Sequence, residues 1–197
     1  MEAVEPLRHR SQIDKMKRVL KQRSPRDYCL FVLGINTGLR VGDLLELTVG
    51  DVLEGSGSRL KIAGRMTLRE QKTHKKRCVV LNTGARSALS AYLKTRKRRF
   101  PEDPLFLSRK HTQDGSLKSL SRQQVWAILS TAAHLSGISL SIGTHTMRKT
   151  FGYFRYIDGQ PVEQLQKIFN HSHPAITLAY IGITKEIIDD SYRKTVL

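Results

Sequence analysis

The sequence predicts a mainly α-helical chain with a small antiparallel β-sheet, an α+β fold. Apolar residues recur at helical spacing through most of the 197 residues. Between residues 51 and 82 the pattern changes to short β-branched and apolar runs, which glycine-rich or charged turns separate. No internal repeat and no low-complexity linker divides the chain. We therefore expect one domain over residues 1–197, long enough to bury a sizeable core.

The first helices are predicted from one apolar face and from their end signals. The apolar face of the first helix consists of Ile13, Met16, Val19 and Leu20. Ser24 followed by Pro25 is typical of an N-cap and a first helical position, so a second helix is expected from there. Gly38 should end it, and the segment VGDLLEL (41–47) predicts a short third helix.

The strands are predicted in three runs: RLKIAG (59–64), MTLREQ (66–71) and RCVVLN (77–82). Together they predict one antiparallel sheet of about three strands. The lysine-rich segment KTHKK (72–76) falls at the turn between the last two strands.

Helical patterns return after Thr83. Predicted helices cover residues 85–99, 122–137, 145–157 and 162–169, and a short polar helix is expected over 184–193. Ser121 and Thr144 are the expected N-caps of the second and third of these helices. Trp126 lies within the apolar pattern of the helix over 122–137, so we predict a core position for it rather than a stacking role.

The composition is strongly basic. Thirty-four lysines and arginines against 17 aspartates and glutamates give a net charge of +17. Such an excess favours a polyanionic partner, of which nucleic acid is the commonest, although some ribosome-associated or merely soluble basic proteins share this composition. The basic clusters lie at 15–23, 72–77, 94–99 and 147–149, which indicates a folded surface around a ligand rather than a basic tail.

The two cysteines, Cys29 and Cys78, lie among apolar residues and indicate no disulfide framework. The N-terminus lacks the apolar run of a signal peptide, and no apolar stretch reaches the roughly 18 residues of a membrane helix. We therefore expect a cytoplasmic protein, or a nuclear one in a eukaryote.

Two short motifs contain side chains that bind anions. His145 and Arg148 are three residues apart, which places them on one helix face near a helix start, where backbone N–H groups attract anions. Arg40 follows Gly38 between apolar neighbours, and Asp43 is placed to hold its guanidinium from behind. Taken singly, the first motif also fits a solvated helix start and the second a structural salt bridge.

Six residues that can bind or attack a phosphate follow one another in a fixed order: Arg40, Lys72, His145, Arg148, His171 and Tyr180. His171 lies 23 positions after Arg148, and Tyr180 lies nine positions after His171. This ordered set resembles the tyrosine recombinase (phage integrase) family. The resemblance covers residues 13–192, nearly the whole chain. It implies the DNA breaking-rejoining catalytic fold of that family and a site-specific DNA recombinase.

The resemblance also implies a role for each residue. Tyr180 would attack a DNA phosphodiester to leave a 3′-phosphotyrosine, and His145 would take the proton of its hydroxyl, since a phenol with a pKa near 10 is a poor nucleophile. Arg40 and Arg148 would neutralise charge on the phosphate. Lys72 would protonate the leaving oxygen, and His171 would donate a hydrogen bond to the phosphate. No metal ion, other cofactor or ATP is required.

Further members of the predicted site and the partners complete this interpretation. Asp43 is a supporting residue, and the candidate DNA-binding residues are Lys75, Lys76, Arg77 and Lys149. The partners are double-stranded DNA and further copies of this chain, as a dimer or tetramer on DNA. No membrane is involved.

Some assignments have competitors. Lys75 and Lys76 compete with Lys72 for the general-acid role, although the context QKT favours Lys72. Three other late tyrosines are less suited as the nucleophile. Tyr153 and Tyr156 belong to the helix of His145 and are expected in the core, while Tyr192 lies too far beyond His171.

The chain departs from the family pattern at three places. Phe169 and Asn170 replace the common Leu-Gly before the histidine, and the turn survives only if Asn170 adopts left-handed angles. Asp43 stands where glutamate is frequent. A separate N-terminal DNA-clamping domain is expected to be absent, with residues 1–12 a short extension, so the chain is either an excised catalytic domain or a minimal recombinase.

Four alternatives remain at this point. The tail over 181–197 either docks on a neighbouring subunit or packs on its own domain. A type IB topoisomerase shares the chemistry but needs no site pair. A non-catalytic DNA-binding module would explain the net charge but not the ordered residue set. A zinc site at His171 and His173 lacks cysteine or carboxylate ligands nearby.

Overall fold

The computed structural model describes residues 4–55, 60–69, 75–109, 112, 115–183 and 193. The helices are α1 (Arg10–Arg23), α2 (Pro25–Thr37), α3 (Val41–Glu46), η1 (one 3-10 turn, Gly50–Val52), α4 (Thr83–Lys94), α5 (Arg122–Leu135), α6 (Thr146–Ile157), α7 (Val162–Phe169) and α8 (Pro174–Tyr180). The strands are β1 (Leu53–Glu54), β2 (Lys61–Ile62), β3 (Arg65–Arg69) and β4 (Lys76–Val80). The mainly helical α+β prediction is confirmed.

Helix α2 begins and ends where the sequence predicts. The Ser24 side chain accepts a hydrogen bond from the backbone N–H of Asp27 at 3.3 Å, and Pro25 occupies the first helical position. Gly38 ends the helix in the left-handed region with φ of 62°. This turn fixes the direction in which the chain leaves α2 and enters α3.

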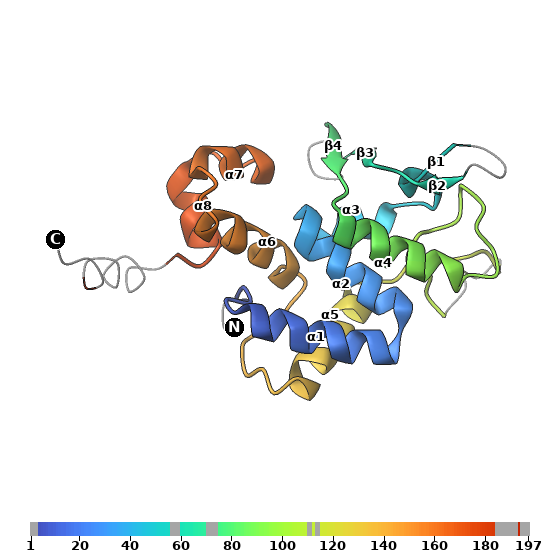
Figure 1. The fold of residues 1–197 in the computed structure, drawn as a ribbon, viewed down its shortest axis with the longest axis horizontal. Coiled ribbons are helices and arrows are strands. Elements are labelled where there is room, and N and C mark those ends of the chain that lie inside the picture. The colour runs from blue at the N-terminus through green and yellow to red at the C-terminus, as the bar shows by residue number, and fades with distance from the viewer. Residues whose placement is uncertain are drawn as a thin grey trace.

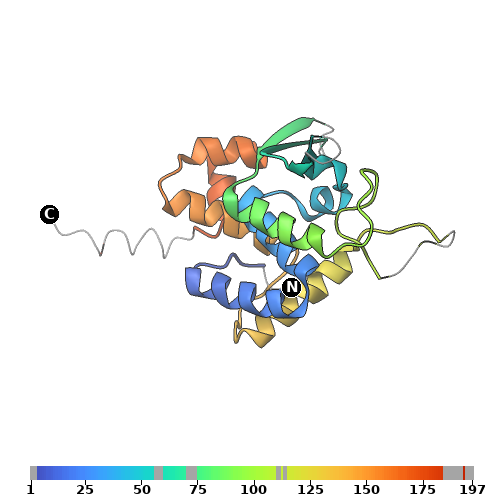
Figure 2. The same ribbon diagram turned by 45° about the vertical axis from the view of Figure 1, so that its right-hand side comes forward.

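Apolar burial places α2 at the centre of the main core. Five successive residues, 29–33, are buried, so this helix has no solvent face at its middle. Helices α1, α4 and α6 all pack against it, and α5 packs against α1 (Figures 1 and 2). Among the described residues, no helix is both long and apolar enough to cross a membrane.

The strands differ from the single sheet that the sequence predicts. In the described part of the chain, β1 pairs with β2 and β3 pairs with β4, each antiparallel, as two separate two-stranded sheets beside α4 (Figure 1). The chain leaves the line of β2 at Ala63, whose N–H donates to Val52 O, and Gly64 accepts from Leu81 N–H. The two-residue strand β1 is too short to give a period in the sequence.

A second, smaller apolar cluster lies beside the main core. Its buried members are Phe151, Leu165, Phe169, Ile181 and Ile183. A Cβ at Gly152 would lie 2.6 Å from both Phe169 Cζ and Ile181 Cγ2, so the absence of a side chain there lets α6 approach α7 and the end of α8 closely. The C-terminal helices are thereby held against α6, at one end of the molecule in Figure 1.

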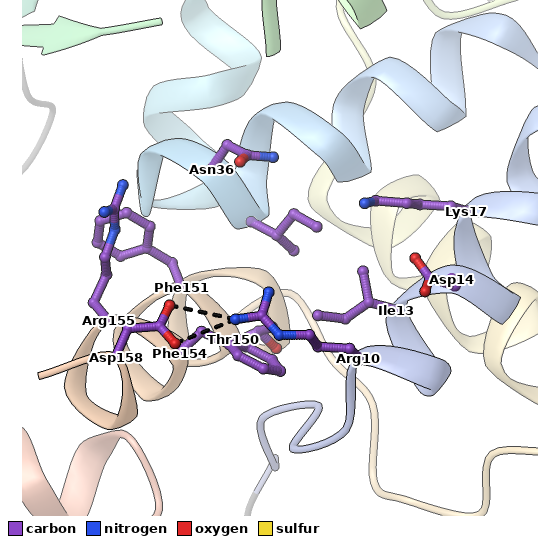
Figure 3. Close-up of a pocket in the computed structure, with 11 residues that line it drawn as sticks. Arg10, Ile13, Asp14, Lys17, Asn36, Thr150, Phe151, Phe154, Arg155 and Asp158 are labelled. Atoms are coloured by element: carbon purple, nitrogen blue, oxygen red, sulfur yellow. Dashed lines mark hydrogen bonds and ion pairs between the residues drawn. The ribbon is translucent and has the colours of Figure 1, made fainter. Parts of the chain in front are cut away.

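A cavity of about 370 Å³ lies between α1, α2 and α6 (Figure 3). Arg10 borders it, forming an ion pair with Asp158 at 3.2 Å and lying 5.1 Å from the ring centroid of Phe154. Both partners of the ion pair are exposed, so it contributes little to stability. The residues of the predicted site do not line this cavity, although Phe151 lines it and also belongs to the second cluster.

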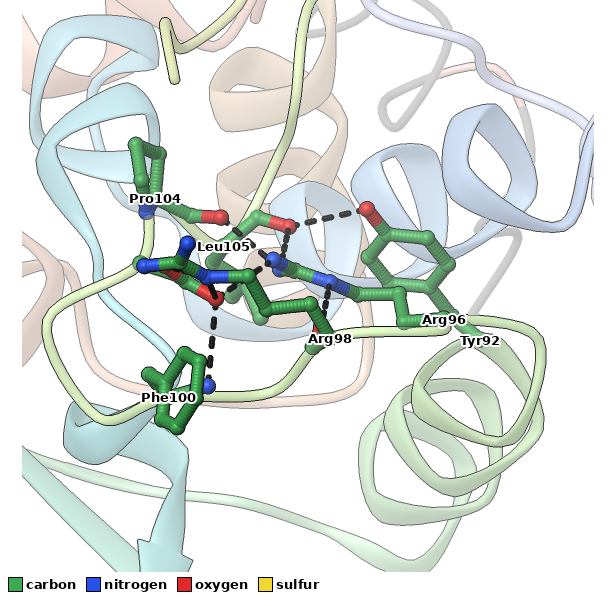
Figure 4. Close-up of polar contacts among 7 residues, drawn as sticks. Tyr92, Arg96, Arg98, Phe100, Pro104 and Leu105 are labelled. Carbon is green, nitrogen blue, oxygen red and sulfur yellow. Dashed lines mark hydrogen bonds and ion pairs between the residues drawn. The ribbon is translucent and has the colours of Figure 1, made fainter. Parts of the chain in front are cut away.

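Helix α4 ends at Lys94, before the predicted end at residue 99, because two arginines of the basic segment 94–99 hold the following loop (Figure 4). Arg96 is buried and donates to the carbonyls of Pro104 at 2.8 Å and Leu105 at 3.1 Å. Arg98 Nε donates to the buried carboxylate of Asp103 at 3.0 Å. These two charges therefore serve the fold, so the basic clusters are not all surface for a ligand.

Two local predictions are wrong. Trp126 is 55% exposed, because it lies one residue beyond Val125 and is rotated about 100° from the buried stripe of α5. The predicted cap of α6 at Thr144 is displaced: the helix begins at Thr146 with His145 at the N-cap position. The Thr146 hydroxyl accepts a hydrogen bond from the backbone N–H of Gly143 at 3.0 Å. This bond closes the turn before α6, so the helix begins one residue later than predicted.

Candidate active site

Arg40 lies at the turn between α2 and α3, in extended conformation at the N-cap position of α3. Its guanidinium is 3.9 Å from Oδ2 of Asp43, whose side chain is 1% exposed, and it donates to Phe169 O at 3.4 Å. The carboxylate behind and the carbonyl beside it fix the direction of this guanidinium.

Arg148 lies in the first turn of α6 and is buried. Its guanidinium donates to the carbonyls of Gly38 and Phe169, the latter at 3.1 Å, and lies 4.6 Å from the Phe169 ring centroid. Arg40 and Arg148 therefore converge on the same carbonyl oxygen, that of Phe169, although they are 108 residues apart. Two fixed cations at one point form an anion-binding arrangement.

His145 and Tyr180 are in direct contact. Nδ1 of His145 lies 3.1 Å from the hydroxyl oxygen of Tyr180, and the rings meet edge to face at 84°. Burial lowers the pKa of His145, and the charges of Arg148 and Lys149 lower it further. The imidazole is therefore neutral at pH 7, in the form that accepts a proton.

Tyr180 is the last residue of α8, with a partly buried side chain beside Phe169 at a ring-centroid distance of 5.5 Å. Burial raises the pKa of its phenol, while the charge of Arg148, a hydrogen bond with that side chain and the charge of Arg40 act in the opposite direction. The hydroxyl thus stays protonated at pH 7 but lies beside both a base and cations.

His171 follows α7, whose end is shaped by Asn170. Asn170 takes left-handed angles, with φ of 55°, as the sequence predicted. Nδ1 of His171 lies 3.0 Å from the hydroxyl of Thr177, and the ring centroids of His171 and Tyr180 are 5.1 Å apart. Burial lowers the pKa of His171, as do the charges of Arg148 and Arg40.

His173 has a separate structural position. It is the N-cap of α8, and its Nδ1 accepts from the backbone N–H of Ala175 at 3.1 Å. No group of three or more His, Cys, Asp or Glu side chains that could hold a metal ion occurs within the described ranges. Nδ1 of His173 is thus used to cap α8, and His171 is the one histidine of this segment that belongs to the candidate site.

The lysine-rich hairpin is described only in part. Lys72 lies outside the described residues. Strands β3 and β4 flank its segment, and their register ends with Arg69 opposite Lys76. Lys75 and Lys76 are exposed, and Arg77 is partly buried.

Of the other late tyrosines, two lie among the described residues and one does not. Tyr153 and Tyr156 belong to α6, are partly buried and pack against the second apolar cluster. Tyr192 lies outside the described residues, as does most of the predicted helix over 184–193.

Several residues of the site were not found from the sequence. The carbonyl of Phe169 serves two arginines, Thr177 fixes the His171 ring, and Gln166 donates to His171 O at 3.1 Å. Lys149, which the sequence analysis names as a candidate DNA contact, has its Nζ 5.3 Å from the ring centroid of Tyr180. Backbone carbonyls and contacts between distant segments give no residue-type signal, so nothing in the sequence indicated these supporting contacts.

The arrangement has the parts of a phosphoryl-transfer site that works through a covalent intermediate. It comprises a protonated phenol, a neutral imidazole within hydrogen-bond distance of it, and two anchored guanidinium groups next to both. Such cations can neutralise the charge of a phosphate, and a phenol oxygen beside a base can act as a nucleophile.

The comparisons with known proteins agree on one family. A family model described as the phage integrase family matches residues 8–186. "Probable integrase/recombinase YoeC" of Bacillus subtilis (strain 168) is 36% identical over 193 residues, 98% of this chain and 97% of that protein. Tyrosine recombinase XerD of Listeria innocua is 29% identical over 174 residues, 86% of this chain and 54% of that protein.

Solved structures share the fold. A crystal structure of XerA recombinase matches 100% of this chain and 66% of its own with a TM-score of 0.75 at 18% identity. The XerH site-specific recombinase, bound to the palindromic difH substrate in a post-cleavage complex, matches 96% of this chain and 52% of its own with a TM-score of 0.70 at 17% identity. The chain thus spans almost the whole of YoeC but about half the length of XerD and XerH.

Proposed function

The chain belongs to the phage integrase family, and from this we propose that it is a site-specific DNA recombinase that cleaves and rejoins DNA through Tyr180. The oxygen of Tyr180 attacks the phosphorus, forming a 3′-phosphotyrosine, and the bond from phosphorus to the 5′-oxygen breaks. A 5′-hydroxyl then attacks the phosphotyrosine and restores a phosphodiester. The covalent link keeps the bond energy, so rejoining needs no ATP.

The single observation that carries this proposal is the contact between His145 Nδ1 and the Tyr180 hydroxyl at 3.1 Å. With its proton on Nε2, the imidazole takes the phenol proton as the oxygen attacks. The lowered pKa of His145 keeps it in the accepting form, and the raised pKa of Tyr180 is the reason that a base is needed. A purely DNA-binding module has no use for this pair.

Arg40 and Arg148 bind the two non-bridging oxygens of the scissile phosphate and offset the charge that grows on them in the transition state. Their convergence at Phe169 O supports this role, because both guanidinium groups then face the same small volume. Asp43 holds Arg40, and His171 donates a hydrogen bond to the phosphate once protonated. Lys72 protonates the leaving 5′-oxygen, an assignment that rests on the sequence alone.

The proposed partners are double-stranded DNA and further copies of the chain. XerH is described in complex with its difH substrate, and a lambda integrase fragment as a dimer bound to a core site. The net charge of +17 supports binding to DNA mainly through phosphates, with an affinity that falls steeply with salt. Lys75, Lys76 and Arg77, at the start of β4, are the candidate contacts. The proposed location is the cytoplasm.

The test begins with the substrate. The Tyr180→Phe protein selects binding duplexes from a random library, and the selected duplexes are remade with nicks that trap a cleaved strand. The intact chain is then incubated with them in EDTA, and covalent adducts are resolved on a denaturing gel. We expect an adduct with the intact chain and with Tyr156→Phe, the matched control from α6, and none with Tyr180→Phe.

Each other result contradicts the proposal or redirects it. An adduct that persists in Tyr180→Phe excludes Tyr180 as nucleophile. Selection of duplexes without any adduct favours the binding module. Relaxation of an arbitrary supercoiled plasmid that lacks the selected sequence favours a type IB topoisomerase activity.

A further inference from the structure

The N-terminal segment 4–8, which we call the strap, lies against chain segments that flank the candidate active site. It contacts both of the chain segments that carry the contacting pair His145 and Tyr180. Its polar contacts are Glu5 N–H to Ser141 O at 3.0 Å, Leu7 N–H to the buried Thr150 hydroxyl at 2.9 Å, and Arg8 to Gly182 O at 3.3 Å. The strap therefore joins the approach to α6, α6 itself and the chain just beyond the nucleophile.

Lys149 connects the strap to the nucleophile. Its Nζ donates to Val4 O at 2.7 Å and lies 5.3 Å from the ring centroid of Tyr180. Burial lowers the pKa of this partly buried amine, and the carboxylate of Glu5, in the strap, acts against that shift. The ammonium is thus placed by a backbone carbonyl, and the tyrosine ring lies against it.

The fit of the strap against the start of α6 is close. A Cβ at Gly143 would lie 2.7 Å from Val4 Cγ2, so the missing side chain is what lets Val4 approach. At the other end a Cβ at Gly182 would lie 3.2 Å from both Arg8 and Pro6. Glycines at both ends allow the strap to lie against the segments before His145 and after Tyr180.

From this geometry we infer that Lys149 is a positioning residue for Tyr180, and that the carbonyl of Val4 in the strap sets its position. The inference rests on the proposed role of Tyr180 as nucleophile. An ammonium is attracted to the face of an aromatic ring, and a ring held on that face keeps its hydroxyl directed at His145. Lys149 acts on the ring, so it is not itself a proton donor in the reaction.

The alternative is the role expected from the sequence, a contact between Lys149 and a DNA phosphate. The two roles differ in what they change. A positioning residue changes the rate of the covalent step when the protein saturates the DNA, whereas a phosphate contact changes the affinity and the salt slope of binding.

The test uses the full chain and the nicked duplexes selected with Tyr180→Phe. We expect Lys149→Met to slow adduct formation at saturating protein by about tenfold and to leave the Kd for DNA within about twofold. Lys149→Arg, which keeps a cation and a donor, should stay within about threefold of the intact chain. The matched control is Lys118→Met, which removes an exposed lysine outside the four basic clusters and should change neither quantity.

The strap is tested through Val4. Val4→Gly removes the side chain that packs against Gly143 and loosens the carbonyl that holds Lys149. We expect it to slow adduct formation by about threefold in the intact chain and to add nothing in the Lys149→Met background, because both changes act through one contact. Thermal melting of every variant shows whether it is folded. If Lys149→Met does not fold, the single variants Lys149→Arg and Val4→Gly still test the inference.

The outcomes separate the two proposals. If the intact chain forms no adduct, the proposed function fails, and the inference fails with it. If the intact chain forms an adduct at the same rate as folded Lys149→Met, only the inference is overturned. A loss of affinity equal to the loss of rate identifies a phosphate contact instead, and additive effects of the Val4 and Lys149 changes exclude the strap as the element that places Lys149.

Discussion

Nδ1 of His145 lies 3.1 Å from the Tyr180 hydroxyl, and the pKa values of the two groups move in opposite directions: burial lowers that of His145 and raises that of Tyr180. The same surroundings thus disfavour the charged form of both partners. At pH 7 the hydrogen bond between the two side chains therefore has its proton on the phenol oxygen, with Nδ1 of His145 as the acceptor, which is the state from which a base-assisted attack begins.

The pH dependence of DNA cleavage follows from this pair. Neutral His145 is the active base, and its pKa lies below the ordinary value of 6.5, so the rate should fall with decreasing pH and the midpoint of this acid limb should lie below pH 6.5. The measurement is the rate of adduct formation between pH 5 and 8 with DNA well below its Kd, where the pH dependence reports the pKa of the free chain. His145→Gln should slow it by about 10²- to 10⁴-fold and remove the acid limb. A midpoint at or above 6.5 in the intact chain would contradict the assignment of His145 as the base.

Arg148 should be needed for both activity and stability. Arg148→Met removes one of two converging cations, so we expect adduct formation to slow by about 10²- to 10³-fold. It also removes the donor to the carbonyls of Gly38 and Phe169, which should lower the free energy of unfolding by about 1–3 kcal/mol. Denaturant unfolding and the gel assay measure the two effects, and Arg10→Met, an exposed arginine of α1, is the control. A rate within tenfold of the intact chain would exclude a role at the phosphate.

DNA binding should raise the pKa of His171. In the free chain burial and the charges of Arg148 and Arg40 lower it, so a phosphate that neutralises those charges reverses part of the shift. We expect the NMR titration of His171 in Tyr180→Phe to move to higher pH with a bound duplex. A duplex with an uncharged methylphosphonate at the cleavage position is the control and should have a smaller effect. Equal shifts with both duplexes would place the phosphate elsewhere.

Trp126 and Leu129 should respond differently to truncation. Both belong to α5, but Leu129 is 1% exposed and Trp126 is 55% exposed. Leu129→Ala should lower the free energy of unfolding by about 2–5 kcal/mol and Trp126→Ala by less than about 1 kcal/mol. Urea unfolding of the two variants measures both losses and tests whether the Trp126 side chain is exposed in solution. A loss above 2 kcal/mol for Trp126→Ala would not fit the structure.

Gly38 should not tolerate a side chain. A Cβ there would collide with the ring of Phe151 and would also require an alanine at φ of 62°. Gly159 has φ of 90° with no atom within 4 Å of such a Cβ, so Gly159→Ala isolates the backbone effect, about 1 kcal/mol. We expect a larger loss of stability and of cleavage for Gly38→Ala. Equal melting temperatures for the two variants would show that the contact with Phe151 is unimportant.

Local rules allowed much of the fold to be predicted from the sequence. The Ser24 and Gly38 signals lie in adjacent residues and use backbone groups of the same helix, so they gave the bounds of α2 correctly. The two-residue strand β1 has no period to detect, and it was missed. Trp126 was placed wrongly because a large apolar residue beside a buried stripe looks the same in sequence whether it faces in or out.

The candidate site was predicted as an ordered set of residue types, and the structure brings five of its six members together. The sixth, Lys72, lies outside the described residues. What the sequence could not give were contacts that depend on the path of the chain. Phe169 O accepts from both arginines, and Lys149 is placed by Val4, 145 residues away. Neither a carbonyl oxygen nor a distant valine carries a signal of its own.

The site also lies at a boundary between two apolar clusters. Arg40 belongs to elements of the main core, whereas Tyr180 and the carbonyl of Phe169 belong to α7 and α8, which pack in the smaller cluster. A unit with so few buried side chains opens at a lower free energy than the whole chain. Such an opening would carry the nucleophile away from the arginines while the rest stays folded, so damaged or incompletely folded copies would be unable to cut DNA.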